Sequence, residues 1–345
     1  MMKKSILPVI VGLVMMNTAC SDWTELEKKD YYRPSIEEEN PAEYEKYLEG
    51  VRAYKETDHK VMILTMEGTA TYPVTQAQLP MAMPDSADYI CIKNAVELHE
   101  VVVADIKDVK EKKGTKVLSY VDNAIADDAW IAYSNGKVDA GEPAPTVEER
   151  RTFYKENAAA QLASYDKYGF DGVMVSFLGS YSDDEVASEK GFMEAVKEWS
   201  DSHPEHLMFM RGNFNLVTDK DLRSKSKYFV IVMGGASGAA SYKSNLRTLL
   251  RTVEEKDRNI FEIMVPERPG EEQVGDSPLE AAKTILSEDV ANYEPYKTVG
   301  LCVSNAGDDY FTSDESFANI RPAINFMNNN DAEGPDNEED TANDK

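Results

Sequence analysis

The sequence is poor in the residues that hold transition metals or form disulfides. It has 3 Cys and 4 His in 345 residues, and the histidines lack the paired spacing of a zinc site. We therefore expect no metal and no other cofactor. Cys91 and Cys302 each lie inside an apolar, strand-like run, which favours buried free thiols over a disulfide.

Positive charge is also scarce. The chain has 37 Lys and Arg against 63 Asp and Glu, a formal net charge of −26. Nucleic acid and anionic membrane surfaces both need positive charge, so neither is expected as a partner. The balance suits a soluble protein with a neutral ligand. Part of the excess lies in residues 330–345, which lack apolar side chains to bury and are expected to be disordered.

One long apolar run exists, from Ile6 to Met16, behind two lysines at the N-terminus. Its length and flanks are typical of a secretory signal rather than a spanning helix. Cys20 directly follows Ala19, which resembles a lipoprotein cleavage box, although Asn17 stands where that box usually has Leu. Residues 1–19 would then be removed and Cys20 lipidated. The alternative is a secreted protein with an incidental cysteine in its signal.

The following segment "SDWTE" resembles the start of lipoproteins exported to the outer-membrane surface of glycan-foraging bacteria. This resemblance implies a lipid-anchored protein at the cell surface. Residues 20–56 are polar and charged, and predict a tether that ends in a short helix.

Residues 57–329 alternate strand and helix patterns regularly. Eight strands, each followed by a helical stretch, have the count and size of an α/β fold with a single (β/α)8 TIM barrel. A doubly wound sheet is the alternative, but "EGTATYP" after the first strand is not a Gly-rich phosphate loop. The predicted strands span 60–67, 88–93, 115–122, 169–177, 206–212, 227–235, 259–267 and 298–306.

The fourth strand, within "KYGFDGVMVSFLG", resembles the corresponding strand of family 18 glycoside hydrolases, the chitinases and endo-β-N-acetylglucosaminidases. That family has D-G-x-D-x-D-x-E with apolar residues at x. Asp171, the glycine after it and the apolar positions match. Met174, Ser176 and Leu178 stand where the family has Asp, Asp and Glu, so the resemblance is to the scaffold and departs at the chemistry.

The resemblance implies a substrate-assisted mechanism in which the Glu protonates the leaving oxygen and an Asp orients the substrate's acetamide. General-acid catalysis contributes about 10²–10⁴-fold, and Leu178 has no proton to give. Ser176 can hydrogen-bond an acetamide but is too weak an acid to replace the carboxyl. The first hypothesis is therefore a non-catalytic protein that binds N-acetylglucosamine-containing glycans, either N-glycans or chitooligosaccharides, and passes them to neighbouring hydrolases or an importer.

Two further departures from the family also favour a non-catalytic protein. The sixth strand ends in Met233 and glycines where the family usually offers a Tyr, and the eighth ends at Asn305 where it has a Trp.

The binding site of such a barrel lies where its strands end. Aromatic, amide and charged side chains there suit a neutral sugar, because C–H faces stack on rings while hydroxyls need donors and acceptors. The alternative for each aromatic is packing at the barrel rim. The candidate ligand-binding residues are Glu67, Asp122, Trp130, Tyr133, Ser176, Tyr181, Arg211, Asn213, Tyr242, Asn305 and Tyr310.

Two other functions stay open. An active glycosidase with relocated carboxylates would use Glu67, Asp122 or Asp184 as acid and base. The alternative for the first two is pairing with a neighbour such as Arg211, and Asp184 also fits a helix capping box. The remaining hypothesis is a scaffold lipoprotein that binds a protein partner and no sugar.

Overall fold

The computed structural model describes residues 36–179, 183–267, 270–311, 313 and 315–328. The predicted signal, Cys20, Tyr181 and the acidic tail lie outside these residues. The chain divides into two compact units, Met1–Lys46 and a larger one that begins at Tyr47. In the first unit the structure describes α2 (Ile36–Glu39) and the start of α3 (Pro41–Lys55).

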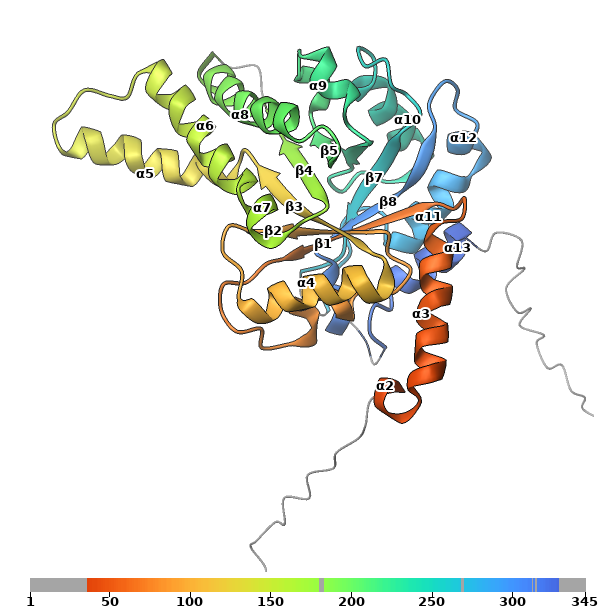
Figure 1. Ribbon diagram of the computed structural model, residues 1–345. Helices are drawn as coiled ribbons and strands as arrows, with labels where there is room; N and C mark the ends of the chain where they lie inside the picture. Colours follow the sequence, from red (N-terminus) through yellow and green to blue (C-terminus); the bar gives the residue numbers. More distant parts are fainter. Residues whose placement is uncertain (1–35, 180–182, 268–269, 312, 314, 329–345) are drawn as a thin grey trace, which may run out of the picture. The chain divides into compact units, whose positions relative to one another are not determined.

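The larger unit is a closed barrel of eight parallel strands in the order of the sequence (Figure 1). The predicted single (β/α)8 barrel is confirmed, and each predicted strand has its counterpart. The strands are β1 (Val61–Glu67), β2 (Tyr89–Lys93), β3 (Lys116–Asp122), β4 (Gly172–Phe177), β5 (Leu207–Gly212), β6 (Tyr228–Val232), β7 (Asn259–Met264) and β8 (Thr298–Ser304).

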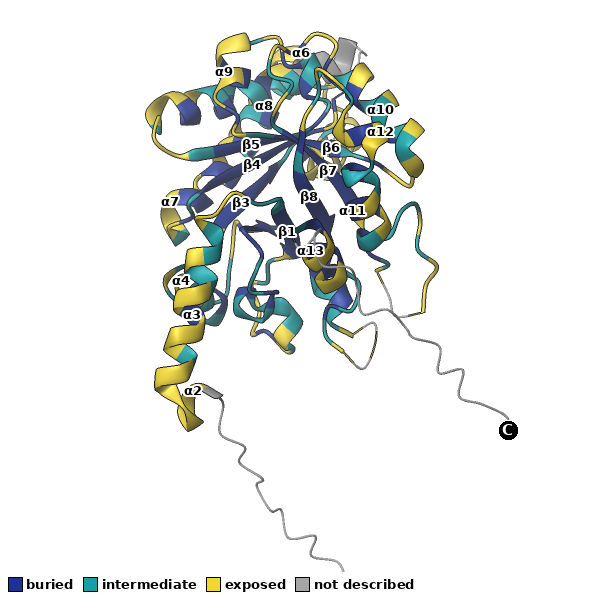
Figure 2. Ribbon diagram, turned by 90° about the vertical axis from the view of Figure 1, so that its right-hand side faces the viewer, coloured by how far each residue is buried: buried dark blue, intermediate teal, exposed yellow. Residues whose placement is uncertain are grey.

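The strands are buried on both faces, as a parallel sheet covered by helices requires (Figure 2). Alternate residues of β4 show why its sequence is nearly continuously apolar. Met174 belongs to the cluster inside the barrel, whereas Val173, Val175 and Phe177 belong to the cluster that packs against the helices. Successive side chains of this strand therefore alternate between the barrel interior and the covering helices.

Helices and short 3-10 turns connect the strands. The helices of the barrel unit after α3 are α4 (Glu100–Lys113), α5 (Ile125–Asp139), α6 (Val147–Leu162), α7 (Ser164–Tyr168), α8 (Asp183–Ser202), α9 (Lys220–Ser224), α10 (Gly238–Leu249), α11 (Pro278–Leu286), α12 (Glu288–Ala291) and α13 (Ile320–Asn328). The 3-10 turns are η1 (Gln76–Gln78), η2 (Pro80–Ala82), η3 (Phe214–Leu216) and η4 (Ala306–Phe311). None of the described helices has the length and apolarity to cross a bilayer.

Two helix boundaries of the segment before β4 are well defined. The capping box at Thr146 forms, with the Thr146 hydroxyl accepting from the Glu149 backbone N–H and the Glu149 carboxylate accepting in return. Gly169 ends α7 at φ 65°, a left-handed conformation that glycine adopts without strain. These two residues fix where the chain enters and leaves the segment before β4.

Helix α5 follows the end of β3. Residues 125–139 form this helix, which makes a hairpin with α6 beside the barrel (Figure 1). Ala126 and Trp130 of α5 are buried against Tyr154 of α6, and this small cluster is separate from the barrel core. The candidates Trp130 and Tyr133 therefore lie on a helix rather than directly at the end of a strand.

Candidate functional site at the barrel mouth

A buried ion pair lies where the strands end. Arg211 of β5 holds Glu262 of β7 with two parallel hydrogen bonds, Nε to Oε2 at 2.5 Å and Nη2 to Oε1 at 2.7 Å. The Ser304 hydroxyl donates to Oε1 at 2.5 Å, and Arg211 Nη1 donates to the Ser176 hydroxyl at 3.0 Å. Two parallel hydrogen bonds between a guanidinium and a carboxylate form a strong ion pair with a fixed orientation.

The Glu262 carboxylate affects the pKa of Arg211. Burial by itself lowers the pKa of Arg211, but the adjacent Glu262 carboxylate outweighs burial and leaves that pKa raised. Both oxygens of Glu262 already accept hydrogen bonds, and its side chain is 4% exposed. Glu262 is therefore engaged by the protein and not placed to deliver a proton to a ligand.

One residue of the β4 motif, Ser176, contacts this pair. Met174 is fully buried inside the barrel, and Ser176 is also fully buried, with its hydroxyl accepting from Arg211. Ser176 was expected to touch a ligand, but its burial makes it a support for Arg211 instead. Asp171 accepts from the Val117 backbone N–H at 2.8 Å at the opposite end of the strand, which is a structural role.

Leu178 lies one residue beyond β4 and is 47% exposed. Its backbone N–H donates to the Asn123 side chain at 3.2 Å. Gly212 at the end of β5, with φ 91°, allows close approach here, because a Cβ would meet the Phe177 carbonyl oxygen at 2.5 Å. The position that carries the family's acid thus holds an aliphatic side chain at the surface.

Asp122 is the last residue of β3 and pairs with Ser176 in the register of β3 and β4. Burial raises the pKa of Asp122, against the opposing effects of the Ala124 backbone N–H, Arg211 and Ser176. The Ala124 N–H donates to Oδ1 at 3.0 Å. A partly buried carboxyl with a raised pKa at this end of a barrel is a candidate acid.

Glu67 lies at the surface of the mouth. Its carboxylate accepts from Asn94 at 2.7 Å, lies 3.4 Å from the Lys93 ammonium and is 60% exposed. Lys93 also donates to the Asn305 side chain at 3.1 Å. The expected alternative of pairing with a neighbour holds for Glu67, but the partner is Lys93 rather than Arg211. In η4, which follows β8, burial raises the pKa of the Asp308 carboxyl, and the nearby Glu267 and Glu67 carboxylates also raise it.

The cavity at the mouth is small. It measures about 130 Å³, and Lys93, Arg211, Glu262 and Asn305 are among its lining residues. Sites for drug-sized ligands typically measure about 300–1,000 Å³. As the described residues form it, this cavity is smaller than a site for a whole sugar ring, and it fits a small polar group such as an acetamide. Within the described residues, no group of three His, Cys, Asp or Glu side chains is placed to hold a metal.

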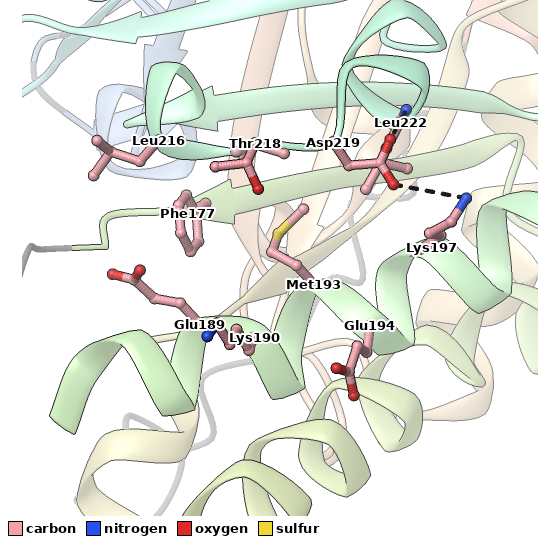
Figure 3. A pocket seen from close by; sticks show the side chains of 11 residues that line it. Phe177, Glu189, Lys190, Met193, Glu194, Lys197, Leu216, Thr218, Asp219 and Leu222 are labelled. Atoms are coloured by element: carbon pink, nitrogen blue, oxygen red, sulfur yellow. Dashed lines mark hydrogen bonds and ion pairs between the residues drawn. The ribbon is translucent and has the colours of Figure 1, made fainter. Parts of the chain in front are cut away.

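Two larger cavities lie off the barrel axis. One of about 260 Å³ is bordered by the ends of β3 and β4 and by α5, α6 and α8. Another of about 400 Å³ lies between α8 and the segment after β5, with Phe177, Met193 and Leu222 along its walls (Figure 3). Its rim is closed by the Lys197–Asp219 ion pair at 3.7 Å.

The remaining predicted aromatics differ in their surroundings. Tyr242 is fully buried between α10 and β7, where its ring packs 4.5 Å from Phe261, so the expectation that it contacts a ligand is wrong. Tyr133 is 39% exposed and stacks on Phe153. Tyr310 lies in η4 and packs on the barrel's outer cluster.

The remaining polar candidates are also located. Asn213 bridges the ends of β4 and β5, because its backbone N–H donates to the Phe177 carbonyl and its side chain donates to the Gly179 carbonyl. Asp184 lies in the first turn of α8. The structure therefore brings Asp122, Arg211 and Asn305 to the mouth and gives Asn213 a structural role.

Sequence reasoning missed Glu262. A signal existed, because Glu262 is a single carboxylate inside the apolar run "NIFEIM", and a buried charge in such a run requires a partner. Lys93 at the end of β2 and Arg150 on α6 were also overlooked.

The chain is an eight-stranded parallel (β/α)8 barrel with polar residues at the strand ends. The chain belongs to the family described as glycoside hydrolase family 18, BT1044-like, whose pattern matches residues 24–326. No curated relative matches the chain closely enough for comparison.

Solved structures share the fold. A selenomethionine variant of BT1044 superposes with a TM-score of 0.58 at 16% identity, over 86% of this chain and 98% of that one. The endo-β-N-acetylglucosaminidase of Cordyceps militaris gives 0.53 at 18% identity, over 81% of this chain and 95% of its own. A mutant of that enzyme, in complex with fucosyl-N-acetylglucosamine-Asn, gives 0.56 at 16% identity over the same shares.

Proposed function

We propose that this protein binds N-acetylglucosamine-containing glycans at the barrel mouth without hydrolysing them. The observation that carries the proposal is the pairing of Arg211 with Glu262 beneath a β4 strand that lacks the family's acids. Leu178 cannot protonate a leaving oxygen, and Glu262 has its oxygens engaged. The general-acid contribution of about 10²–10⁴-fold is then missing.

Polar groups at the mouth support binding. Asn305 provides an acceptor and donors, and Lys93 and Arg211 provide cationic donors, around a cavity of about 130 Å³. That volume suits an acetamide or a hydroxymethyl group rather than a sugar ring, so the sugar would lie across the mouth. The complex of the Cordyceps militaris mutant with fucosyl-N-acetylglucosamine-Asn supports this choice of ligand class.

The proposal includes anchoring at the cell surface. The two N-terminal lysines, the apolar run from Ile6 to Met16 and Cys20 support export and lipidation of Cys20. A surface-anchored binder would retain glycans for an importer or for separate hydrolases. Metabolic labelling with a fatty acid tests the anchor, because Cys20→Ala abolishes labelling if the proposal is right.

Titration calorimetry with chitobiose and a high-mannose N-glycan tests binding. We expect saturable heat with both sugars, and weaker affinity in the variant Lys93→Met, which removes a half-buried donor of the mouth. Lys107→Met, on the outer surface of α4, is the matched control and keeps the affinity of the wild type. If neither sugar produces heat, glycan binding is contradicted and the protein-scaffold hypothesis remains.

The raised pKa of Asp122 favours a second candidate, slow hydrolysis with a relocated acid. A general acid acts while protonated, so this activity would fall as the pH rises through the pKa of Asp122. Asp122→Asn would abolish such release of glycan, whereas Glu67→Gln would keep it because Glu67 is exposed and paired with Lys93. Equal release by wild type and Asp122→Asn excludes this role for Asp122.

A further inference from the structure

The cavity of about 260 Å³ beside the mouth has features of a binding site of its own. We call it the hairpin pocket, because the α5–α6 hairpin forms one of its sides. Its lining includes Asn123, Trp130, Ile131, Arg150, Tyr154 and Leu178. It adjoins the barrel mouth through consecutive residues, since Asp122 ends β3 at the mouth and Asn123 follows it into the pocket.

Arg150 is held rigidly in this pocket. Its guanidinium lies over the rings of Trp130, at 5.6 Å, and Tyr154, at 5.7 Å. Nε donates to the Ser188 hydroxyl at 2.7 Å. Among the described residues, no hydrogen bond engages Nη1 or Nη2, so two oriented donor groups remain for a ligand.

Acceptors and apolar surface complete the lining. One oxygen of Asp127 accepts from the Tyr154 hydroxyl, which leaves the other oxygen. The Asn123 oxygen accepts from the Leu178 backbone N–H, which leaves its amide donors. Leu178 and Ile131 are 47% and 55% exposed. Donors, acceptors and apolar faces around one cavity are what a sugar ring requires.

The charge and the volume of the hairpin pocket indicate which class of ligand it can bind. The pocket lining carries one arginine and two carboxylates, Asp127 and Glu189, and the chain has a net charge of −26. An acidic sugar is therefore disfavoured. A volume of 260 Å³ lies just below the range of about 300–1,000 Å³ for drug-sized ligands, which suits one monosaccharide unit rather than an oligosaccharide.

We propose that the hairpin pocket binds one neutral monosaccharide unit of a glycan whose N-acetylglucosamine end lies at the barrel mouth. This inference rests on the proposed function and adds to it a second subsite. A glycan long enough to reach both sites gains affinity from the second contact, whereas chitobiose occupies the mouth alone.

Two exposed residues of α5 provide a matched test. Ile131 lines the pocket, and Val138 lies seven residues later, close to the same helix face, outside the lining. Their exposures are 55% and 57%, so neither substitution disturbs the core. Ile131→Arg places a long side chain at the pocket, and Val138→Arg adds the same charge elsewhere on the helix.

Titration calorimetry is run on the full-length protein with a high-mannose N-glycan and with chitobiose. We expect Ile131→Arg to weaken N-glycan binding by about tenfold or more and to leave chitobiose binding unchanged. Val138→Arg should change neither. Wild-type affinity of Ile131→Arg for the N-glycan, or equal weakening for both sugars, overturns the subsite while glycan binding stands. Absence of binding to the wild type overturns the proposed function and the subsite together.

Tryptophan fluorescence gives an independent readout. Trp130 lies in the pocket, whereas Trp199 is buried among Tyr165 and His203 at another place in the fold. The N-glycan should change the emission of the wild type and of Trp199→Phe, but not that of Trp130→Phe. A change that persists in Trp130→Phe contradicts the assignment of the ligand to this pocket.

Discussion

Arg211 and Glu262 determine what the barrel mouth can do. Their ion pair lies beside Ser176 of β4, and both oxygens of the Glu262 carboxylate accept hydrogen bonds there. A buried pair is weak evidence for stability, since desolvation opposes the attraction. The position of the pair is more informative, because its two opposite charges neutralise each other at this end of the barrel.

Removal of one partner should be costly. Arg211→Met leaves Glu262 buried and unpaired, and we expect a loss of about 3–5 kcal/mol of unfolding free energy. The double variant Arg211→Met with Glu262→Met removes both charges and should recover much of that loss. Urea denaturation of both variants measures the effect. A double variant as unstable as the single one contradicts this account of the pair.

His59 connects stability to pH. Its Nε2 lies 2.9 Å from Asp88 Oδ1, and this hydrogen bond, against burial, raises the pKa of His59 above 6.5. The resulting stabilisation is fully present below pH 6.5 and is lost as the pH rises through the raised pKa. Unfolding free energies measured from pH 5.5 to 9 should therefore decline in the wild type. His59→Gln should flatten that decline, and an unchanged slope would exclude His59 as its source.

At the scale of elements, periodicity predicted the strands and most helices. The apolar runs of β1 to β8 are short and bounded by turn residues, so eight strands followed from sequence. Helix α5 did not follow, because "IADDAWIAYSNGKVD" has no clear apolar stripe and contains a glycine. Its helical state is explained by Trp130 and Ala126 packing on Tyr154 of α6, a contact that the local sequence does not reveal.

The candidate site was also predictable from the sequence only in part. Strand ends located Asp122, Arg211 and Asn305 at the mouth, because parallel strands place their carboxyl ends together. The partner of Arg211 could not be assigned, since the position of Glu262 relative to Arg211 depends on the register of β6 with β5 and with β7. Burial of Tyr242 likewise depends on how α10 packs against β7.

The α5–α6 hairpin offers an element-scale prediction. Thr146→Ala removes the hydroxyl that accepts from the Glu149 N–H at the start of α6. We expect a loss of about 1 kcal/mol, typical of a helix N-cap. Hydrogen exchange should show faster exchange in the first turn of α6 and unchanged exchange in α11, which is capped separately by Ser277. Unchanged exchange in α6 would show that the box does not stabilise the helix.

At the scale of the whole molecule, a family 18 barrel is retained while the acids of its β4 motif are replaced. Eight strands, their covering helices and the small mouth cavity still present polar groups at one end of the barrel. The hairpin pocket adds a second place for a sugar beside that end. Under the proposed function, this fold keeps glycan recognition and lacks a proton donor at position 178.

The most direct test combines binding with turnover on one preparation. Purified protein is incubated with a high-mannose N-glycoprotein, and released glycan is measured by mass spectrometry beside an active endo-β-N-acetylglucosaminidase, while calorimetry measures binding of the free glycan. The account predicts saturable binding and no release above the buffer control. Release of glycan by the wild-type protein would contradict it.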